Sequence, residues 1–220
     1  MTQALKIAVL ASGRGSNLAA LIEAHAAGQL PVEFTLVASD KADAGALQLA
    51  ETARIPTLAL LPRNYADRAS YDRELFARIA ASGAELLVLA GFMRIIDGTV
   101  LAPWAGRIIN IHPSLLPKYR GLHTHRRALE AGDAEHGASV HFVTAELDGG
   151  PVIAQAKLPV LPDDDEHTLA SRLLPLEHRL LPAVTGLIAS HRLSLGANGI
   201  ELDRQLLAQP LLLGEDTLAA

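Results

Sequence analysis

Cysteine is absent from this chain of 220 residues, and its absence excludes several kinds of chemistry. Without a thiol the chain can form no disulfide, no thiolate metal site and no cysteine nucleophile. Aromatic side chains are scarce, at 1 Trp, 3 Tyr and 4 Phe, so Ala, Leu, Ile and Val must fill the interior. The length and a hydrophobic content of 50% allow one core, or one core with a small appendage.

Positive charge is not in excess either. The formal net charge is -5, whereas a protein that binds a nucleic-acid backbone should carry a strongly basic face. No apolar run approaches the roughly 18 residues of a membrane span. The polar segment Ser12–Asn17 also interrupts any secretory signal near the start. We therefore expect a cytoplasmic protein with no nucleic-acid partner and no membrane partner.

Short apolar runs alternate with helical patterns through about residue 111. Strands are predicted at 5–10, 34–38, 57–61, 86–90 and 107–111, and helices at 16–27, 42–53 and 71–82. The run Leu86–Ala90 is apolar throughout, as in a strand that is buried on both faces. This alternation predicts the α/β class with a doubly wound, mostly parallel sheet.

The second half of the chain has a mixed pattern. It predicts a helix at 124–131 and two strands at 138–143 and 152–157, joined by a turn at Asp148-Gly149-Gly150. A long helix should begin at Asp163–Glu166 and reach Ser190, although Pro175 and Pro182 should kink or divide it. Short strands are predicted at 193–195 and 200–202. No long linker is evident, so we expect one domain over 1–220, with halves at about 1–111 and 112–220.

The segment Ser12-Gly13-Arg14-Gly15-Ser16-Asn17 follows the first strand and precedes the first helix. Glycines let a backbone approach an anion closely, and a helix N-terminus offers free N–H groups. The full dinucleotide fingerprint is absent because Leu18 stands where a third glycine would be, and no P-loop lysine follows. The segment indicates an anion site. The alternative is a glycine turn that only permits close packing of strand and helix.

Three polar residues point to chemistry. Asn110 and His112 should share one face of a strand that ends at Pro113, and Asp148 precedes Gly149-Gly150. An amide can stabilise an oxyanion, an imidazole can exchange protons near neutral pH, and a carboxylate favours a charged imidazole. Because no covalent nucleophile is evident, these types favour direct transfer between two bound substrates. Taken singly, a histidine before proline is usually structural, and an aspartate before Gly-Gly is usually a turn residue.

Histidine is the other candidate metal ligand. His123 and His125 form a His-x-His pair, and His136 and His141 are near in sequence. These spacings match no helical pair of zinc ligands. We therefore expect no metal site, and we expect His136 to be solvated or loop-stabilising.

With these segments in view, the chain resembles the phosphoribosylglycinamide formyltransferases, a family of formyl-folate enzymes of purine biosynthesis. The resemblance rests on Ser12–Asn17, Ala90-Gly91-Phe92-Met93-Arg94-Ile95, Asn110-Ile111-His112-Pro113-Ser114-Leu115-Leu116-Pro117 and Asp148-Gly149-Gly150-Pro151. Matches run in order from about Lys6 to Leu181. The third segment is shared with other formyl-folate enzymes, so the joint pattern carries the specificity.

The resemblance implies transfer of the formyl group of 10-formyltetrahydrofolate to the amine of glycinamide ribonucleotide, with no metal. Asn110 and His112 would stabilise the tetrahedral intermediate, with His112 as proton donor and Asp148 as its partner. The ribonucleotide would contact Gly15, Ser16, Asn17 and Glu177. The folate would contact Arg68, Met93, Arg94, Ile95, Ile96, Asn110, Thr144, Ala145, Glu146, Leu147 and Asp148. The chain would act as a monomer or a homodimer.

One residue departs from the family pattern. Arg120 stands in Lys118-Tyr119-Arg120-Gly121, where proline is more often expected, and this change could alter the flexibility of a loop beside the site. The rivals are a methionyl-tRNA formyltransferase, which should be longer and more basic, and a deformylase, which should carry a domain before the first strand. A non-catalytic nucleotide-binding module would not require Asn110, His112 and Asp148 together. A dehydrogenase is a further rival, which the incomplete dinucleotide fingerprint disfavours.

Overall fold

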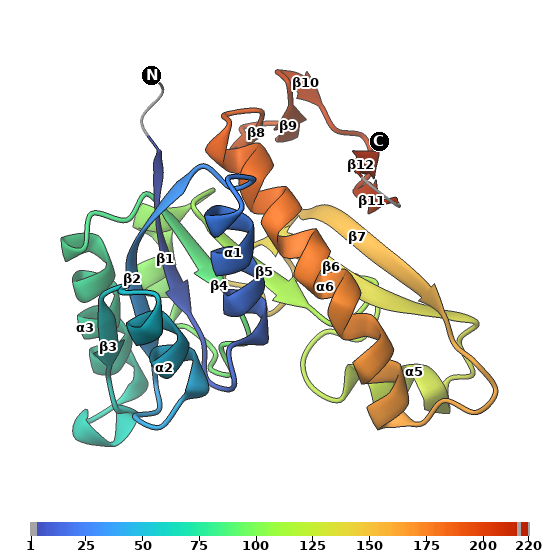
Figure 1. The fold of residues 1–220 in the computed structure, drawn as a ribbon, viewed down its shortest axis with the longest axis horizontal. Coiled ribbons are helices and arrows are strands. Elements are labelled where there is room, and N and C mark those ends of the chain that lie inside the picture. The colour runs from blue at the N-terminus through green and yellow to red at the C-terminus, as the bar shows by residue number, and fades with distance from the viewer. Residues whose placement is uncertain (1–3, 215–216, 220) are drawn as a thin grey trace. The chain divides into compact units, whose positions relative to one another are not determined.

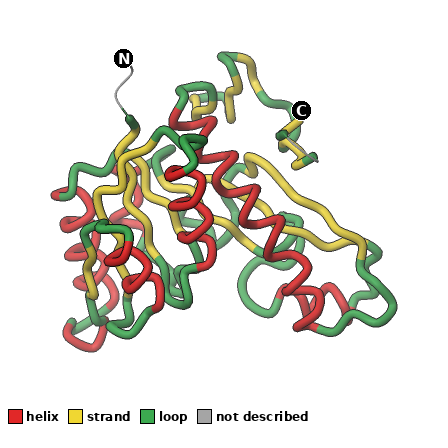
Figure 2. The backbone as a smooth tube through the Cα atoms, in the orientation of Figure 1, coloured by secondary structure: helices red, strands yellow, loops and turns green. Residues whose placement is uncertain are grey.

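The structure is a computed structural model that describes residues 4–214 and 217–219. It contains two compact units, one that ends at Asn110 and one that begins at Ile111. Figure 1 labels most elements of both units, and Figure 2 distinguishes their helices, strands and loops.

The first unit is built on a parallel sheet with the strand order β5-β4-β1-β2-β3. The bounds are β1 Leu5–Leu10, β2 Val32–Ser39, β3 Thr57–Ala59, β4 Leu86–Leu89 and β5 Ile108–His112, of which Ile111 and His112 belong to the second unit. The chain moves outward from β1 to β3 and then returns to β4 on the other side of β1 (Figure 1). Such a reversal defines a doubly wound sheet. The predicted α/β class is confirmed.

The helices of this unit follow their local capping signals. They are α1 Ser16–Ala26, α2 Gly45–Thr52, α3 Arg68–Ala81 and α4 Gly98–Leu101, with 3-10 turns at Pro62–Asn64 and Ala102–Trp104. The predicted start of α3 at Tyr71 was wrong by three residues. Asp67 accepts the Ser70 N–H at 2.7 Å, and Ser70 Oγ receives the Asp67 N–H at 3.3 Å, which completes a capping box one turn earlier.

Aliphatic side chains fill the centre of the first unit, as the scarcity of aromatics predicts. Ile7, Val9, Leu87 and Val88 on β1 and β4 have no exposed surface. Each such side chain contributes roughly 1.5–3 kcal/mol by leaving water. These two central strands therefore fix the positions at which the loops after β1 and β4 begin.

The second unit pairs β6 Glu135–Phe142 antiparallel to β7 Val152–Pro159, as predicted. β11 Leu211–Leu213 adds to β7 in parallel, and β12 Leu218–Ala219 pairs antiparallel with β11. A small antiparallel sheet contains β8 Leu193–Gly196, β9 Gly199–Leu202 and β10 Gln205–Leu206. The sequence predicted β8 and β9. It did not predict β10 to β12, because strands of two or three residues show no period.

The helices of the second unit are α5 Thr124–Glu130 and α6 Glu166–Ala189. Asp165 caps α6 by accepting the Thr168 N–H at 2.7 Å. Pro175 and Pro182 were predicted to kink or divide this helix. Division was wrong, since both lie inside one continuous helix. Its contacts with β6, β7 and β8 outweigh the backbone hydrogen bonds that the two prolines cannot donate.

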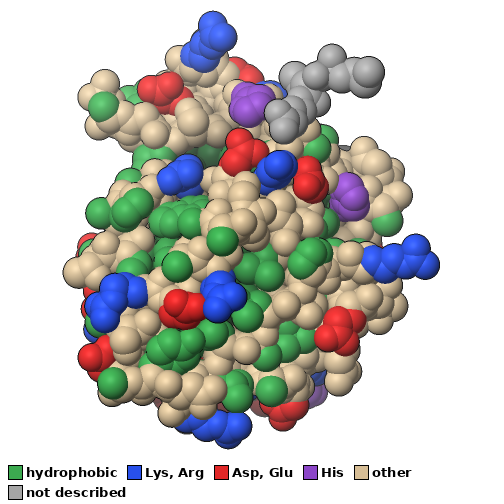
Figure 3. All heavy atoms as spheres, turned by 90° about the vertical axis from the view of Figure 1, so that its left-hand side faces the viewer, with side chains coloured by type: hydrophobic (Ala, Val, Ile, Leu, Met, Phe, Trp, Pro, Cys, Tyr) green, Lys and Arg blue, Asp and Glu red, His purple; other side chains and the backbone are tan. Residues whose placement is uncertain are grey.

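Charges of both signs are dispersed on the face that Figure 3 draws. Lys and Arg side chains lie interspersed with Asp and Glu among hydrophobic side chains. No continuous basic surface is visible among the described residues on this face, in keeping with the net charge of -5. In the described residues, no helix is both long and apolar enough to cross a membrane.

Candidate active site

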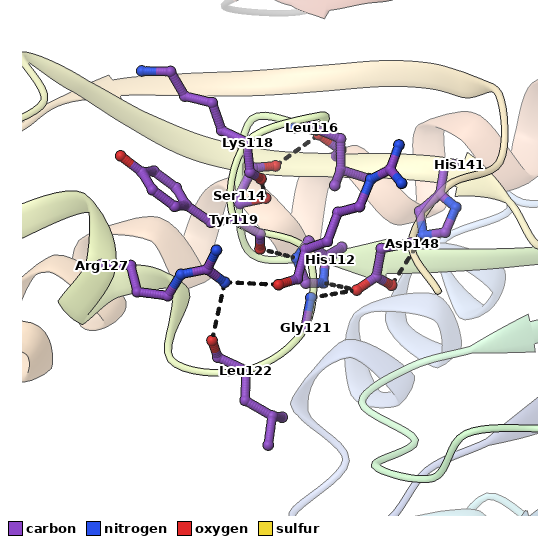
Figure 4. Close-up of polar contacts among 12 residues, drawn as sticks. His112, Ser114, Leu116, Lys118, Tyr119, Gly121, Leu122, Arg127, His141 and Asp148 are labelled. Atoms are coloured by element: carbon purple, nitrogen blue, oxygen red, sulfur yellow. Dashed lines mark hydrogen bonds and ion pairs between the residues drawn. The ribbon is translucent and has the colours of Figure 1, made fainter. Parts of the chain in front are cut away.

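His112 lies at the last position of β5, where the strand opens into a loop. The three isoleucines of this strand and the His112 ring are all buried, and Pro113 follows at once. His112 Nδ1 lies 3.5 Å from Asp148 Oδ2 (Figure 4). Its Nε2 lies 2.9 Å from the carbonyl oxygen of Tyr119. Because a carbonyl only accepts, Nε2 carries a proton and donates it, which leaves Nδ1 facing the carboxylate.

The structure therefore brings together two of the three residues that the sequence selected, although 36 positions of chain separate them. Asn110 precedes His112 by two positions on β5, is half-buried, and pairs in register with Leu89 of β4. Alternate residues of a strand share one face. Asn110 and His112 are therefore on the same side of β5.

Asp148 is held by a tightly packed turn. Its backbone adopts φ 48°, in the left-handed region, and its side chain is only 10% exposed. A Cβ on Gly150 would stand 1.8 Å from the carbonyl oxygen of Phe142, so only glycine fits there. The predicted Asp-Gly-Gly turn thus has a packing reason for its second glycine.

A second histidine faces the same carboxylate. His141 Nε2 lies 3.7 Å from Asp148 Oδ1, and His141 Nδ1 donates to the carbonyl of Phe142 at 2.9 Å. Burial is the largest influence on the pKa of His141 and lowers it, although the charge of Asp148 opposes the shift. The sequence grouped His141 only with candidate metal ligands. Its approach to Asp148 follows from the pairing of β6 with β7.

Backbone groups of the loop between β5 and α5 complete the surroundings of this pair. The Gly121 N–H donates to Asp148 Oδ2 at 2.8 Å, while Tyr119 accepts from His112 (Figure 4). Sequence reasoning missed both contacts, because a backbone donor or acceptor leaves no signal in residue type. Three residues of this loop, Tyr119, Gly121 and His123, have positive backbone φ angles, which mark its turns.

Side chains fix this loop from several directions. Ser114 Oγ donates to the Lys118 carbonyl at 2.6 Å, and Lys118 Nζ and the Tyr119 hydroxyl both donate to Asp133. The hydrogen bond from Lys118, followed by that from Tyr119, lowers the pKa of Asp133. Arg120 forms an ion pair with Glu146. The departure from proline at 120 therefore adds a contact between two loops of this unit.

The loop after β1 has the geometry expected of a glycine turn before a helix. Gly15 has φ 82° and precedes α1, and a Cβ there would stand 2.7 Å from Ala46 Cα. Ser12 accepts the Met93 N–H at 2.9 Å through its hydroxyl. This contact ties the predicted phosphate segment to the predicted folate segment within the first unit.

The segment after β4 presents apolar side chains to solvent. Met93 is 69% exposed and Ile95 is 56% exposed. Beneath it, the Arg94 guanidinium lies 4.9 Å from the centre of the Tyr71 ring. The fully buried Asp72 accepts the Asp97 N–H at 2.7 Å. Burial is the largest influence on the pKa of Asp72 and raises it.

The remaining residues that were predicted to contact substrates lie on α3, on α6 and in the loop before Asp148. Arg68 begins α3 with its side chain about half exposed, 4.0 Å from Asp97 Oδ2. Glu177 is half-buried near the middle of α6. Thr144, Ala145, Glu146 and Leu147 form the loop before Asp148. Among residues 4–214 and 217–219, no group of three His, Asp or Glu side chains is placed to hold a metal ion.

Comparison with known proteins gives the family. Residues 5–185 match the model of the formyl transferase family. The chain belongs to the formyl transferase family. It is 49% identical to phosphoribosylglycinamide formyltransferase of Escherichia coli over 92% of this chain and 96% of that protein. It is 42% identical to the Haemophilus influenzae enzyme of the same name, over 92% and 95% of the two chains.

Solved structures agree with the sequence comparison. The phosphoribosylglycinamide formyltransferase of Coxiella burnetii superposes with a TM-score of 0.89 at 45% identity, covering 93% of this chain and 96% of that one. The resemblance stated from four short segments is therefore confirmed over nearly the whole chain.

Proposed function

We propose that this chain transfers the formyl group of 10-formyltetrahydrofolate to the amine of glycinamide ribonucleotide. The amine nitrogen attacks the formyl carbon and forms a tetrahedral intermediate. The bond from that carbon to N10 of the folate then breaks, and N10 takes a proton as tetrahydrofolate leaves. The products are formylglycinamide ribonucleotide and tetrahydrofolate. The observation that carries the proposal is the His112–Asp148 pair at 3.5 Å in a chain of this family.

Each member of the proposed trio has a role that its chemistry allows. The Asn110 amide donates to the oxygen that becomes negative, and His112 supplies a proton to the intermediate. Since Nε2 is occupied by Tyr119, Nδ1 is the nitrogen that exchanges this proton. Asp148 stabilises the charged ring and accepts the amine proton, directly or through water.

Substrate contacts follow the family resemblance. Gly15, Ser16 and Asn17 hold the ribonucleotide phosphate at the start of α1, where N–H groups and the helix dipole favour an anion. Glu177 contacts the ribose or glycinamide end. The exposed Met93 and Ile95, with Arg94, Ile96 and the 144–148 loop, contact the folate. Arg68 contacts its acidic tail. The enzyme works in the cytoplasm as a monomer or homodimer, without metal.

The deciding assay follows tetrahydrofolate release by absorbance, with and without glycinamide ribonucleotide. Release that requires the ribonucleotide supports the transferase, and equal release without it would identify a deformylase. His112→Ala and Asp148→Asn should each lower kcat by roughly 10²- to 10⁴-fold, the usual contribution of a proton-transfer group. His167→Ala and Asp163→Asn, at exposed positions, are the matched controls. A kcat near that of the controls would refute the assigned roles.

The phosphate site has its own test. Ser16→Asp places a negative charge at the start of α1 and should raise the KM for the ribonucleotide by repulsion, with a smaller effect on the folate KM. An unchanged ribonucleotide KM would remove the phosphate from this loop. Activity that survives dialysis against a chelator would support a reaction without metal.

A further inference from the structure

One peptide unit joins a positive charge to the carboxylate of the His112–Asp148 pair. The carbonyl oxygen of Arg120 accepts a hydrogen bond from Arg127 Nη1 at 2.7 Å. The next N–H, that of Gly121, donates to Asp148 Oδ2 at 2.8 Å. These two groups belong to the same planar amide, whose C=O and N–H point in opposite directions. Figure 4 shows the resulting chain from Arg127 through this peptide to Asp148 and His112.

We propose that Arg127 is a positioning residue for the formyl-transfer site, acting on Asp148 and His112 through the Arg120–Gly121 peptide. The inference rests on the proposed function only for its effect on turnover. Hydrogen bonds in a chain polarise one another, so a guanidinium on the carbonyl end makes the N–H end a stronger donor to the carboxylate. The same contact fixes the orientation of the peptide plane and, with it, the position of Asp148.

Arg127 also holds the loop on either side of this peptide. Its Nη1 lies 3.4 Å from the carbonyl oxygen of Leu122, and its guanidinium carbon lies 5.1 Å from the centre of the Tyr119 ring. Tyr119 is the residue whose carbonyl accepts from His112 Nε2. The Arg127 side chain therefore contacts Tyr119, whose carbonyl is the partner of His112. It also contacts the Arg120–Gly121 peptide, whose N–H is the partner of Asp148.

The neighbouring residue provides a matched control. Arg126 also belongs to α5, but its guanidinium pairs with Glu166 at the start of α6, at 3.0 Å. Arg126→Ala removes the same charge and the same stem from the same helix, without touching the loop. A general loss of charge or helix stability would affect both variants equally, whereas the proposal predicts an effect of Arg127→Ala alone.

The test compares Arg127→Ala, Arg127→Lys and Arg126→Ala for turnover, each checked for folding by circular dichroism. We expect kcat to fall about tenfold in Arg127→Ala, to recover partly in Arg127→Lys, and to stay unchanged in Arg126→Ala. Millimolar guanidinium should restore part of the turnover of Arg127→Ala. In an Asp148→Asn background the Arg127→Ala change should have little further effect, because the Arg120–Gly121 peptide acts on His112 through that carboxylate.

A second readout does not depend on the reaction. In protein labelled with ¹⁵N at histidine, the His112 ring signals should shift in Arg127→Ala and keep their positions in Arg126→Ala. Suppose that the His112 ring signals shift in Arg127→Ala but that His112→Ala has normal turnover. This result would refute the proposed function and leave the positioning by Arg127 intact. Unmoved ring signals, or a tenfold loss that persists in the Asp148→Asn background, would overturn the role of Arg127.

Discussion

Acid should destabilise this protein through one buried histidine pair. His136 on β6 is 1% exposed, and its Nε2 lies 3.0 Å from His125 Nδ1 at the start of α5. Burial, followed by the charge of His125, lowers the pKa of His136 to about 4. Asp133 opposes the shift and His112 adds to it. The pKa of His125 is lowered as well, chiefly by burial.

The sign and size of the effect follow from proton linkage. The ordinary pKa of histidine is 6.5, so His136 becomes protonated below pH 6.5 in the unfolded chain. In the folded protein it stays neutral until about pH 4. Above pH 6.5 His136 is neutral in both the folded and the unfolded state, so its protonation does not change the free energy of unfolding. Between pH 6.5 and 4 the free energy of unfolding falls. At about 1.4 kcal/mol per pKa unit, the loss from His136 is at most about 3 kcal/mol.

Urea unfolding of the wild type and His136→Gln, followed by circular dichroism from pH 7.5 to pH 4, measures this term. Glutamine keeps a polar partner for His125 but does not titrate. As the pH falls, the wild type should therefore lose up to about 3 kcal/mol more of its free energy of unfolding than the variant does. His167→Gln, at an exposed position of α6, should follow the wild type. Parallel curves for His136→Gln and the wild type would refute the reasoning.

Three further changes have defined outcomes. Gly150→Ala should lower stability by about 1–3 kcal/mol and also reduce turnover, since its Cβ would meet the Phe142 carbonyl at 1.8 Å. Gly13→Ala is the control for stability, because a Cβ there would meet nothing within 4 Å and the backbone is not left-handed. Similar melting temperatures for the two variants would contradict this. Asp72→Asn keeps an acceptor for the Asp97 N–H and removes a buried charge, so it should unfold at the same urea concentration as the wild type at pH 7, or at a higher one. Asp72→Ala removes the acceptor and should unfold at a lower urea concentration. Asp165→Ala should cost about 1 kcal/mol by removing the α6 cap, and an unchanged urea midpoint would show that packing alone fixes the helix start.

Local signals were sufficient for much of the first unit. β1 and the start of α1 lie where the apolar run and the Ser16 boundary predict them, because strand and helix periods are written in neighbouring residues. The start of α3 was misplaced, although Asp67 and Ser70 carried a capping signal that could have located it. Packing decided whether Pro175 and Pro182 would break α6, and no local rule contains that information.

The sequence by itself predicted Asn110, His112 and Asp148 as the side chains of the candidate site, since they stand in segments that specify a strand end and a glycine turn. Only the tertiary structure decided that Asp148 lies 3.5 Å from His112. It also decided that Tyr119 and Gly121 contact the pair through backbone atoms, and that Arg127 reaches the same peptide. The reason is physical. Residue type encodes local conformation and side-chain chemistry. Every residue has similar backbone groups, however, and the path of the folded chain determines which groups they bond.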